Sequence, residues 1–153
     1  MPDIISLLNY EEGFSAKPYY CSAGYPTIGI GQRIGPKGAP LKLYEFTVSK
    51  SLAAIWLAEK VKETLADMDK YENIRAAMAA CNDARKSILI SMAYQMGAEG
   101  LAKFINTLKA VTEKRWSDAA AGMLNSAWAK QTPNRAKRHA QQMLTGEWSP
   151  EYK

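Results

Sequence analysis

The apolar residues of the chain recur with a helical spacing over most of its length. Between residues 47 and 70, apolar side chains follow one another at steps of three and four positions, namely Leu52, Ile55, Trp56, Leu57, Val61, Leu65 and Met68. Such steps place the apolar side chains on one face of a helix. Thr47 and Ser49 can cap its N-terminus, and about twenty helical residues span roughly 30 Å. The pattern predicts a connecting helix long enough to join two lobes.

Shorter helical runs occupy both sides of this connecting helix. The first follows Asp3, a candidate N-cap, and stops at Gly13; further helices are predicted over residues 73–80, 82–95, 103–111, 116–125 and 133–144. Pro133 directly follows Thr132 and suits the first turn of the last helix. Almost everything after residue 47 is therefore predicted to be helical.

Residues 17–35 have a different pattern, rich in Tyr, Ile, Thr, Gly and Pro (KPYYCSAGYPTIGIGQRIG), with a Ser-Ala-Gly turn signal in the middle. This pattern predicts a small antiparallel hairpin or meander. Side chains alternate along a strand, so Thr27, Gly29 and Gly31 are expected on one side, lining a cleft. The predicted class is α+β, as a single domain with a β-lobe (13–46), the connecting helix (47–70) and a helical lobe (1–12 and 71–153).

Composition and charge narrow the class of protein further. The 153 residues are 47% hydrophobic and 23% charged, as in an ordinary globular domain. No apolar run reaches the roughly 18 residues of a membrane span, and the N-terminus lacks a basic region before its apolar stretch. We therefore expect no signal peptide, no stable membrane association and a cytoplasmic site of synthesis. Residues 114–153 carry seven basic and three acidic side chains of a chain with net charge +5, which indicates a polyanionic partner or a solvated basic face.

The cysteine and histidine content argues against a metal site or a cofactor. The chain has two cysteines, Cys21 and Cys81, no CxxC motif and one histidine, His139, too few ligands for a cysteine-rich or cysteine-histidine zinc site. Cys81 is expected to lie in an alanine-rich helix and to pack in the core, which disfavours a disulfide with Cys21. The tryptophans are expected to be core anchors, at least three of the four: Trp56, Trp116, Trp128 and Trp148.

The candidate chemistry lies where the first helix meets the strand region. Glu11 and Glu12 are adjacent and cannot share one face of a helix. Glu12 is followed by eight residues, Cys21, five residues and Thr27, within Thr27-Ile28-Gly29-Ile30-Gly31. Two further blocks are Tyr94-Gln95-Met96-Gly97, followed by Phe104 and Asn106, and Trp128 with Gln131-Thr132-Pro133-Asn134-Arg135-Ala136-Lys137-Arg138. These three blocks, in this order, resemble the phage lysozyme family of the T-even type (glycoside hydrolase family 24).

The resemblance implies a lysozyme-like fold of two lobes with a cleft between them. It implies that Glu12, Cys21 and Thr27 are catalytic, that Thr27 holds the attacking water, and that Arg135 pairs with Glu12. Glycoside hydrolysis needs an acid for the leaving oxygen and a second group that activates water or attacks the anomeric carbon. Saccharide contacts are expected from six residues, of which Phe104 could equally belong to the core: Gly31, Tyr94, Gln95, Phe104, Asn106 and Thr107.

The chain departs from the family pattern in three places. The segment between Gly31 and Thr47 is shorter, which implies that a small helix of the N-terminal lobe is missing. Gln32 stands where the T-even enzyme has a histidine, for which the resemblance implies a structural ion pair. Cys21 stands where that enzyme has an aspartate, so base, nucleophile and water-positioning group remain open as its role.

The resemblance thus implies a lysozyme that hydrolyses the β-1,4 bond between N-acetylmuramic acid and N-acetylglucosamine in peptidoglycan. As an endolysin it is expected to act as a monomer, to wait in the host cytoplasm and to depend on a separate membrane pore, a holin, to reach the wall. A catalytically silent wall-binding module is the alternative that Cys21 permits. A nucleic-acid-binding domain would use the same positive charge, but no basic and aromatic cluster of a known motif is present.

Overall fold

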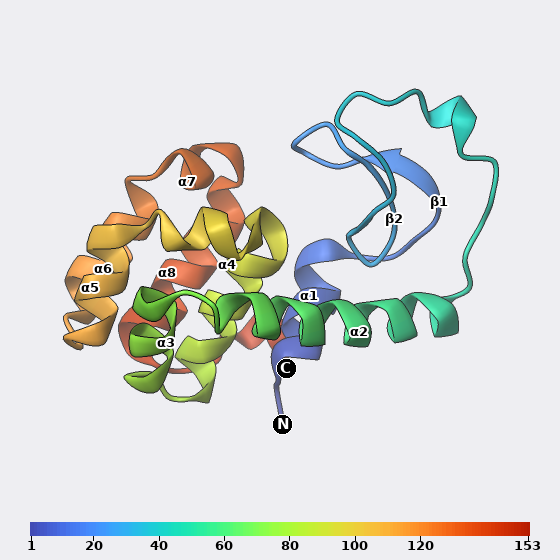
Figure 1. Cartoon of the computed structure of the whole chain (residues 1–153). Helices are drawn as coiled ribbons and strands as arrows, with labels where there is room; N and C mark the ends of the chain where they lie inside the picture. The colour runs from blue at the N-terminus through green and yellow to red at the C-terminus, as the bar shows by residue number, and fades with distance from the viewer.

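The computed structural model describes residues 1–153 as an α+β fold, which confirms the predicted class. The elements in chain order are α1 (Ile4–Glu12), β1 (Ser15–Tyr20), β2 (Pro26–Gly29), β3 (Gln32–Arg33), η1 (Leu41–Leu43), α2 (Lys50–Met68), α3 (Glu72–Ala79), α4 (Asp83–Ala102), α5 (Ile105–Thr112), α6 (Trp116–Leu124), α7 (Ala127–Gln131), α8 (Pro133–Thr145) and η2 (Pro150–Tyr152). The sheet and the helices α3–α8 lie at opposite ends of α2 (Figure 1).

Local chemistry sets the helix ends where the sequence predicts them. Asp3 caps α1 by accepting a hydrogen bond from the backbone of Ser6, and Gly13 ends the helix. Ser49 caps α2 by accepting from the backbone N–H of Leu52. Pro133 occupies the first turn of α8, where a missing N–H is not needed.

Two helices differ from the expectation. The helix predicted over 82–95 continues to Ala102, but Gly97 has a non-helical φ of 83°, so the chain kinks just after the predicted end. The five-residue α7 was not predicted, since it is too short for a periodic apolar pattern. Both features shape the side of the molecule that faces the sheet.

The sheet is antiparallel with strand order β1-β2-β3. Tyr19 pairs with Thr27, and an irregularity interrupts the register between Ser15 and Tyr19. The expectation that Gly29 shares a cleft-facing side with Thr27 and Gly31 is wrong. Gly29 has a φ of 67°, and a Cβ there would meet the side chains of Ala53 and Val48, which are buried in the core. The strand alternation ends at this residue because its backbone leaves the extended region.

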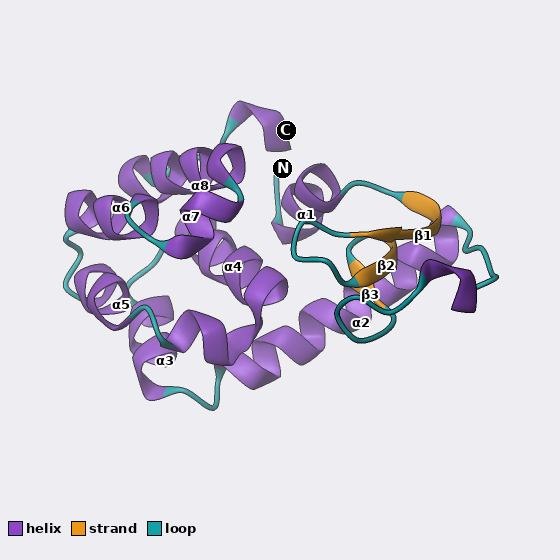
Figure 2. Cartoon of the chain, turned by 90° about the horizontal axis from the view of Figure 1, so that it is seen from above, coloured by secondary structure: helices purple, strands orange, loops and turns teal.

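One core joins the sheet, α2 and the helical group, with α4 in the middle of that group (Figure 2). Ile28 from β2 and Leu57 from α2 are buried in it, as are Leu7 and Leu8 from α1. The tryptophan prediction is confirmed: Trp128 is buried in the core, and the other three are partly buried and packed against it, namely Trp56, Trp116 and Trp148. Cys81 is buried just after the end of α3, not within a helix. None of the helices combines the length and the apolar content required to cross a membrane.

Candidate active site

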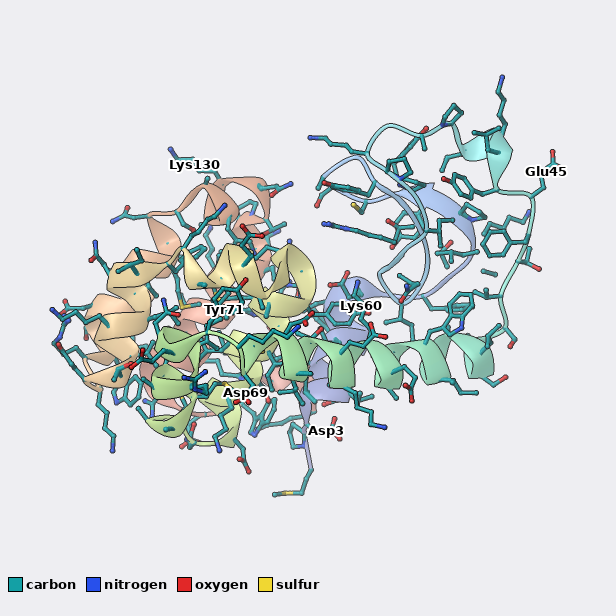
Figure 3. The ribbon with its side chains drawn as sticks, in the orientation of Figure 1. Asp3, Glu45, Lys60, Asp69, Tyr71 and Lys130 are labelled. Carbon is teal, nitrogen blue, oxygen red and sulfur yellow. The ribbon has the colours of Figure 1, made fainter.

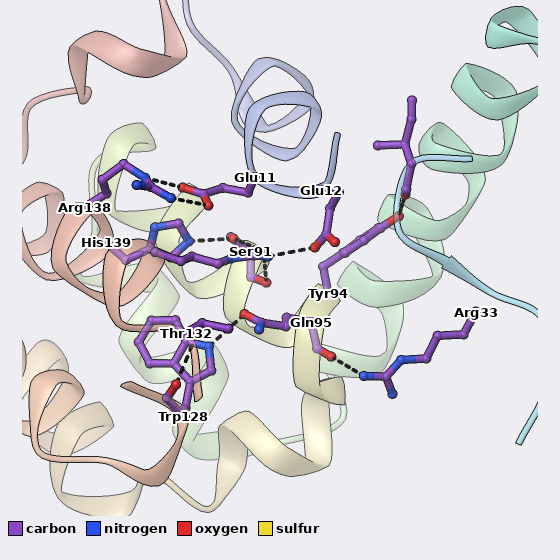
Figure 4. Close-up of polar contacts among 12 residues, drawn as sticks. Glu11, Glu12, Arg33, Ser91, Tyr94, Gln95, Trp128, Thr132, Arg138 and His139 are labelled. Atoms are coloured by element: carbon purple, nitrogen blue, oxygen red, sulfur yellow. Dashed lines mark hydrogen bonds and ion pairs between the residues drawn. The ribbon is translucent and has the colours of Figure 1, made fainter. Parts of the chain in front are cut away.

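A cavity of about 610 Å³ opens where α1, the sheet, α2, α4, α7 and α8 meet. Seven of the ten predicted site residues line it: Glu12, Cys21, Thr27, Gly31, Tyr94, Gln95 and Arg135. These residues come from positions far apart in the sequence, so the fold gathers them in one place. Figure 4 shows the polar contacts among side chains that line the cavity, such as Glu12 and Gln95, and side chains next to them that do not, such as Ser91.

Glu12 is the last residue of α1 and reaches the cavity next to Gly31. Nη1 of Arg135 donates a hydrogen bond to Oε1 of Glu12 at 2.8 Å, while the second carboxyl oxygen has no hydrogen-bond partner in the protein. Gly31 has a φ of 66°, and a Cβ there would lie 2.6 Å from Oε2 of Glu12. Glycine is therefore required at this position, both for the backbone conformation and for the space that the carboxyl group occupies.

Cys21 follows β1 and lies in the same cavity. Burial raises the pKa of its thiol, but hydrogen bonds from the backbone of Tyr25 and Ala23 and from the hydroxyl of Thr27, together with the charge of Arg33, act against burial and lower the pKa overall. The surroundings of Cys21 thus favour the thiolate, which is the form that can accept a proton or attack a carbon.

Thr27 is 1% exposed, and its hydroxyl donates to the carbonyl of Tyr25 at 2.8 Å. A hydroxyl has one proton and two lone pairs. The proton can go to the Tyr25 carbonyl or to the thiolate of Cys21, but not to both at once. While it goes to the carbonyl, the lone pairs of Thr27 are free to accept from a water molecule.

Tyr94 and Gln95 tie the helical part of the cavity wall to the sheet. The hydroxyl of Tyr94 donates to the carbonyl of Ile30 at 2.7 Å, and its pKa is raised by burial and then by the charge of Glu12. The side-chain oxygen of Gln95 accepts from Nε1 of Trp128 at 2.7 Å. The backbone carbonyl of Gln95 accepts from Arg33 at 3.2 Å, a contact between α4 and β3. Both residues thus hold the walls of the cavity together.

Two cations in the cavity were not predicted from the sequence. Arg33 stacks on the ring of Tyr25 at 4.0 Å. Lys60 projects from the middle of α2 (Figure 3) and lies 4.5 Å from the centre of the Tyr94 ring. Burial lowers the pKa of Lys60, and the charge of Glu12 opposes that effect. Arg33 could have been found, since it follows Gly31 by two positions in the predicted strand, but Lys60 looks like any polar residue on a helix.

Three predicted saccharide contacts lie outside this cavity. Asn106 and Thr107 line a separate hollow of about 340 Å³ between α5 and α6. Thr107 is 7% exposed, and Phe104 is partly buried against the core at the start of α5. Direct contact between these residues and a saccharide stays a prediction, which their position does not favour.

Glu11 makes no side-chain hydrogen bond with the predicted site residues, unlike its neighbour Glu12. Its side chain is 2% exposed and accepts two hydrogen bonds from Arg138, each 2.8 Å long, and one from the hydroxyl of Tyr152 at 2.5 Å. The bond to Glu11 raises the pKa of Arg138. The adjacent carboxylates face different partners, as their spacing on a helix requires. Glu11 is a structural anchor between the first and the last helices.

The cavity holds an acid with one open oxygen, a thiol whose ionisation is favoured, and a hydroxyl beside it. It is large enough for a ligand the size of a sugar unit. No group of three or more His, Cys, Asp or Glu side chains in the chain is placed to hold a metal ion. This arrangement is suited to general acid–base or nucleophilic catalysis, as hydrolases use it.

The fold and the site thus indicate an α+β hydrolase, with a carboxyl group at the end of the first helix that reaches the cavity. Residues 9–144 match the phage lysozyme family, and the chain belongs to that family. It is 28% and 32% identical to probable T4-type lysozymes 1 and 2 of Dictyostelium discoideum, over 94% and 92% of both chains respectively. It is 30% identical to the peptidoglycan hydrolase gp36 of Pseudomonas phage phiKMV, over 86% of this chain and 14% of that protein. The chain is an enzyme, a glycosidase of the lysozyme type.

Proposed function

We propose that the chain is an endolysin of glycoside hydrolase family 24 that hydrolyses the β-1,4 bond between N-acetylmuramic acid and N-acetylglucosamine in peptidoglycan. The observation that carries the proposal is the position of Glu12 in the cavity. Arg135 holds one of its carboxyl oxygens, the other is open, and Cys21 and Thr27 line the same cavity. The relative named a peptidoglycan hydrolase supports the substrate class.

In the proposed reaction Glu12 is the general acid. It gives its proton to the oxygen that leaves the anomeric carbon, so that the carbon–oxygen bond breaks without an unstable alkoxide. Arg135 orients the carboxyl group through one oxygen and leaves the other to face the substrate. Gly31 permits the close approach of the strand to this acid.

Cys21 and Thr27 supply the second half of the reaction. Thr27 holds a water molecule through its free lone pairs, and the thiolate of Cys21 accepts a proton from that water as its oxygen bonds to the anomeric carbon. The products are two shorter glycans, with the proton of the water on the thiol. Direct attack by the thiolate would give a covalent intermediate and retention of configuration, whereas attack by water inverts the anomeric centre.

The cavity is then the cleft between a β-lobe (13–46) and a helical lobe (1–12 and 71–153) joined by the segment 47–70. Tyr94 and Gln95 form the helical wall, to which the glycan would bind. The basic C-terminal part of the chain attracts the anionic wall. In this proposal the protein acts as a monomer, binds peptidoglycan and no nucleic acid, and reaches the wall through a holin.

The test is clearing of a peptidoglycan suspension, followed by analysis of the new reducing ends. After borohydride reduction, cleavage at the proposed bond yields reduced muramic acid, while cleavage at the other bond yields reduced glucosamine. Glu12→Gln keeps the shape of the side chain and loses the proton, so the rate of clearing should fall at least 10²-fold. A wall-binding module would bind the suspension without clearing it, and a variant with a tenth of the parent rate would assign the acid role to another residue.

A further inference from the structure

His139, the only histidine of the chain, lies in the middle of a buried hydrogen-bonded chain that connects Glu11 with Arg135. It is fully buried on α8. Its Nε2 is 2.6 Å from the hydroxyl of Ser91, and its Nδ1 is 3.2 Å from the hydroxyl of Tyr152. Figure 4 shows His139 beside Ser91, between the Glu11–Arg138 pair and Glu12. None of the reactions proposed above uses this imidazole.

Glu11 and Arg135 stand at the two ends of this hydrogen-bonded series, and they determine which atom is the donor in each hydrogen bond between them. Glu11 accepts two hydrogen bonds from Arg138 as a carboxylate, so the hydroxyl of Tyr152 must donate its single proton to Glu11. The oxygen of Tyr152 can then only accept from Nδ1 of His139. Nδ1 therefore carries the proton of the neutral imidazole.

The hydrogen bonds on the other side of the ring are fixed in the same way. With the proton on Nδ1, Nε2 of His139 is an acceptor, and the hydroxyl of Ser91 donates to it. The oxygen of Ser91 then accepts from Nη2 of Arg135 at 2.8 Å. Each hydrogen bond that links Arg135, Ser91, His139, Tyr152 and Glu11 in series then has one donor and one acceptor.

The opposite tautomer breaks this series at two places. With the proton on Nε2, the hydroxyl of Ser91 would accept from both Arg135 and the ring, and its own proton would have no acceptor among these partners. Tyr152 would donate to Nδ1, and its oxygen would face the carboxylate of Glu11 at 2.5 Å with no proton between them. Buried polar contacts without a proton are costly, so the Nδ1–H form is strongly favoured.

Burial disfavours the charged form of His139, and the positive charges of Arg135 and Arg138 on α8 add to this effect, so the pKa of His139 lies well below its ordinary value. The groups that face it from other elements are Ser91 on α4 and Tyr152 near the C-terminus, with Trp128 at 5.9 Å from ring to ring. Glu11 on α1 is reached only through Tyr152, and Glu12 only through Arg135.

We propose that His139, as the neutral Nδ1–H tautomer, is a positioning residue for the active site: it fixes the hydroxyl of Ser91 as an acceptor for Arg135 and thereby holds the guanidinium that orients Glu12. This inference deepens the proposed function and rests on it. Without the lone pair of Nε2, the hydroxyl proton of Ser91 has no acceptor on α8. It can then turn toward Nη2 of Arg135, which is itself a donor. The remaining partner of Nη2 is the backbone carbonyl of Ser91, which is 3.4 Å away.

The tautomer can be measured without any substitution. The single imidazole gives one pair of nitrogen signals in a long-range proton–nitrogen spectrum of the ¹⁵N-labelled protein. We expect a protonated Nδ1 and an unprotonated Nε2, with no change between about pH 5 and 8, where an ordinary histidine titrates. A protonated Nε2, or titration of the ring within that range, would overturn the inference while leaving the proposed function intact.

Two substitutions separate the two nitrogens. The amide of His139→Gln can place its oxygen near the position of Nε2 and accept from Ser91, whereas that of His139→Asn reaches only the position of Nδ1 and can donate to Tyr152. We expect kcat for wall cleavage to fall about tenfold or more in the Asn variant with little change in KM, because small displacements of catalytic groups cost up to about 10²-fold. The Gln variant should retain most of the activity, and Ser91→Ala should resemble the Asn variant.

Rates are compared for folded protein, with circular dichroism and thermal unfolding as controls. Equal losses in the Gln and Asn variants at equal folded fractions would overturn the positioning role, since a purely structural residue makes no such distinction. If a variant does not fold, the tautomer measurement on the parent still decides the inference. A parent that clears no peptidoglycan would instead refute the proposed function.

Discussion

Cys21 provides the sharpest test of the proposed chemistry, because in the proposed reaction its thiol must lose a proton before water can be activated. Burial disfavours its thiolate, but the backbone of Tyr25 and Ala23, the nearby hydroxyl of Thr27 and the charge of Arg33 favour it. These contacts outweigh the effect of burial and lower the pKa. A free thiol with a pKa of about 8.5 is only about 3% ionised at pH 7, so each unit by which the pKa falls raises that fraction up to tenfold.

The lysis rate should increase with pH, because a general base must be deprotonated. The increase should occur as the pH rises through the lowered pKa of Cys21. Cys21→Asp should retain lysis and move this rise toward acid. The shift should be smaller than the about 4.6 units between free thiol and free aspartate, since the structure has already lowered the pKa of the thiol. Cys21→Ala should lose at least about 10²-fold in kcat, as expected for removing a positioned base.

The assay is the initial rate of wall clearing as a function of pH for the parent, Cys21→Asp, Cys21→Ala and Cys21→Ser. The serine variant is the matched control, because it keeps the size of the side chain but does not ionise in this range. A thiol-specific alkylating reagent should inactivate the parent and spare the Asp variant. If Cys21→Ala clears walls at the parent rate, Thr27 and its water suffice, and the role given to Cys21 is wrong.

Three further predictions concern stability and wall attraction. Glu11→Gln should leave Arg138, whose side chain is 24% exposed, without its counter-charge, and should lower the free energy of unfolding by about 3 kcal/mol. That corresponds to a fall of about 6–12 °C in Tm in calorimetry, and a fall below about 2 °C would contradict the buried anchor. Lysis should weaken as salt rises to ~0.5 M, because charges are screened over about 10 Å already at 0.1 M. Replacing the exposed Lys130 and Lys137 by Gln should flatten the curve, and an unchanged salt profile would mean that they are ordinary surface. Because the pKa of His139 is lowered by burial and by the two nearby arginines, its contribution to stability is complete above about pH 6.5 and is lost as the pH falls below it, by up to about 1.4 kcal/mol per pH unit. His139→Gln should remove this part of the pH dependence in urea titrations, and parallel curves for the two proteins would contradict it.

The salt test uses Lys130 and Lys137 because not every basic residue of the C-terminal part is free to attract the wall. Lys130 extends from α7 away from the molecule (Figure 3). Arg138 is bound to Glu11, and Arg135 to Glu12. Neutralising these two arginines would change the stability and the site together with the charge.

The sequence predicts the helices well where the signal is local. Asp3, Ser49 and Pro133 all lie at helix N-termini, where the signal involves only residues close together in the sequence. The expectation that Gly29 faces the cleft is wrong, because strand alternation assumes an extended backbone. The positive φ of Gly29 goes together with its packing against Ala53. That packing is a tertiary contact, which no short pattern encodes.

The candidate site, too, can be predicted only in part from the sequence. The spacing of Glu12, Cys21 and Thr27 identifies three residues that the fold brings to one cavity. The sequence does not identify Lys60 as a site residue, because a polar residue on a helix can face water or a cavity. Only the position of α2 in the fold places Lys60 in the cavity. His139 looked like an isolated histidine, since its partners Ser91 and Tyr152 are 48 and 13 residues away in the sequence.

The two adjacent glutamates explain how so small a domain can hold its acid in place. The carboxylate of Glu11 fastens the end of α1 to α8 through Arg138 and to the C-terminal turn through Tyr152. One residue further on, Glu12 meets Arg135, which lies one helical turn before Arg138 on α8. Both ion pairs therefore join the same two helices, and the Glu11–Arg138 pair limits the movement available to the Glu12–Arg135 pair. A loss at Glu11 should for that reason reduce stability first, while a loss at Glu12 removes the proton that the reaction needs.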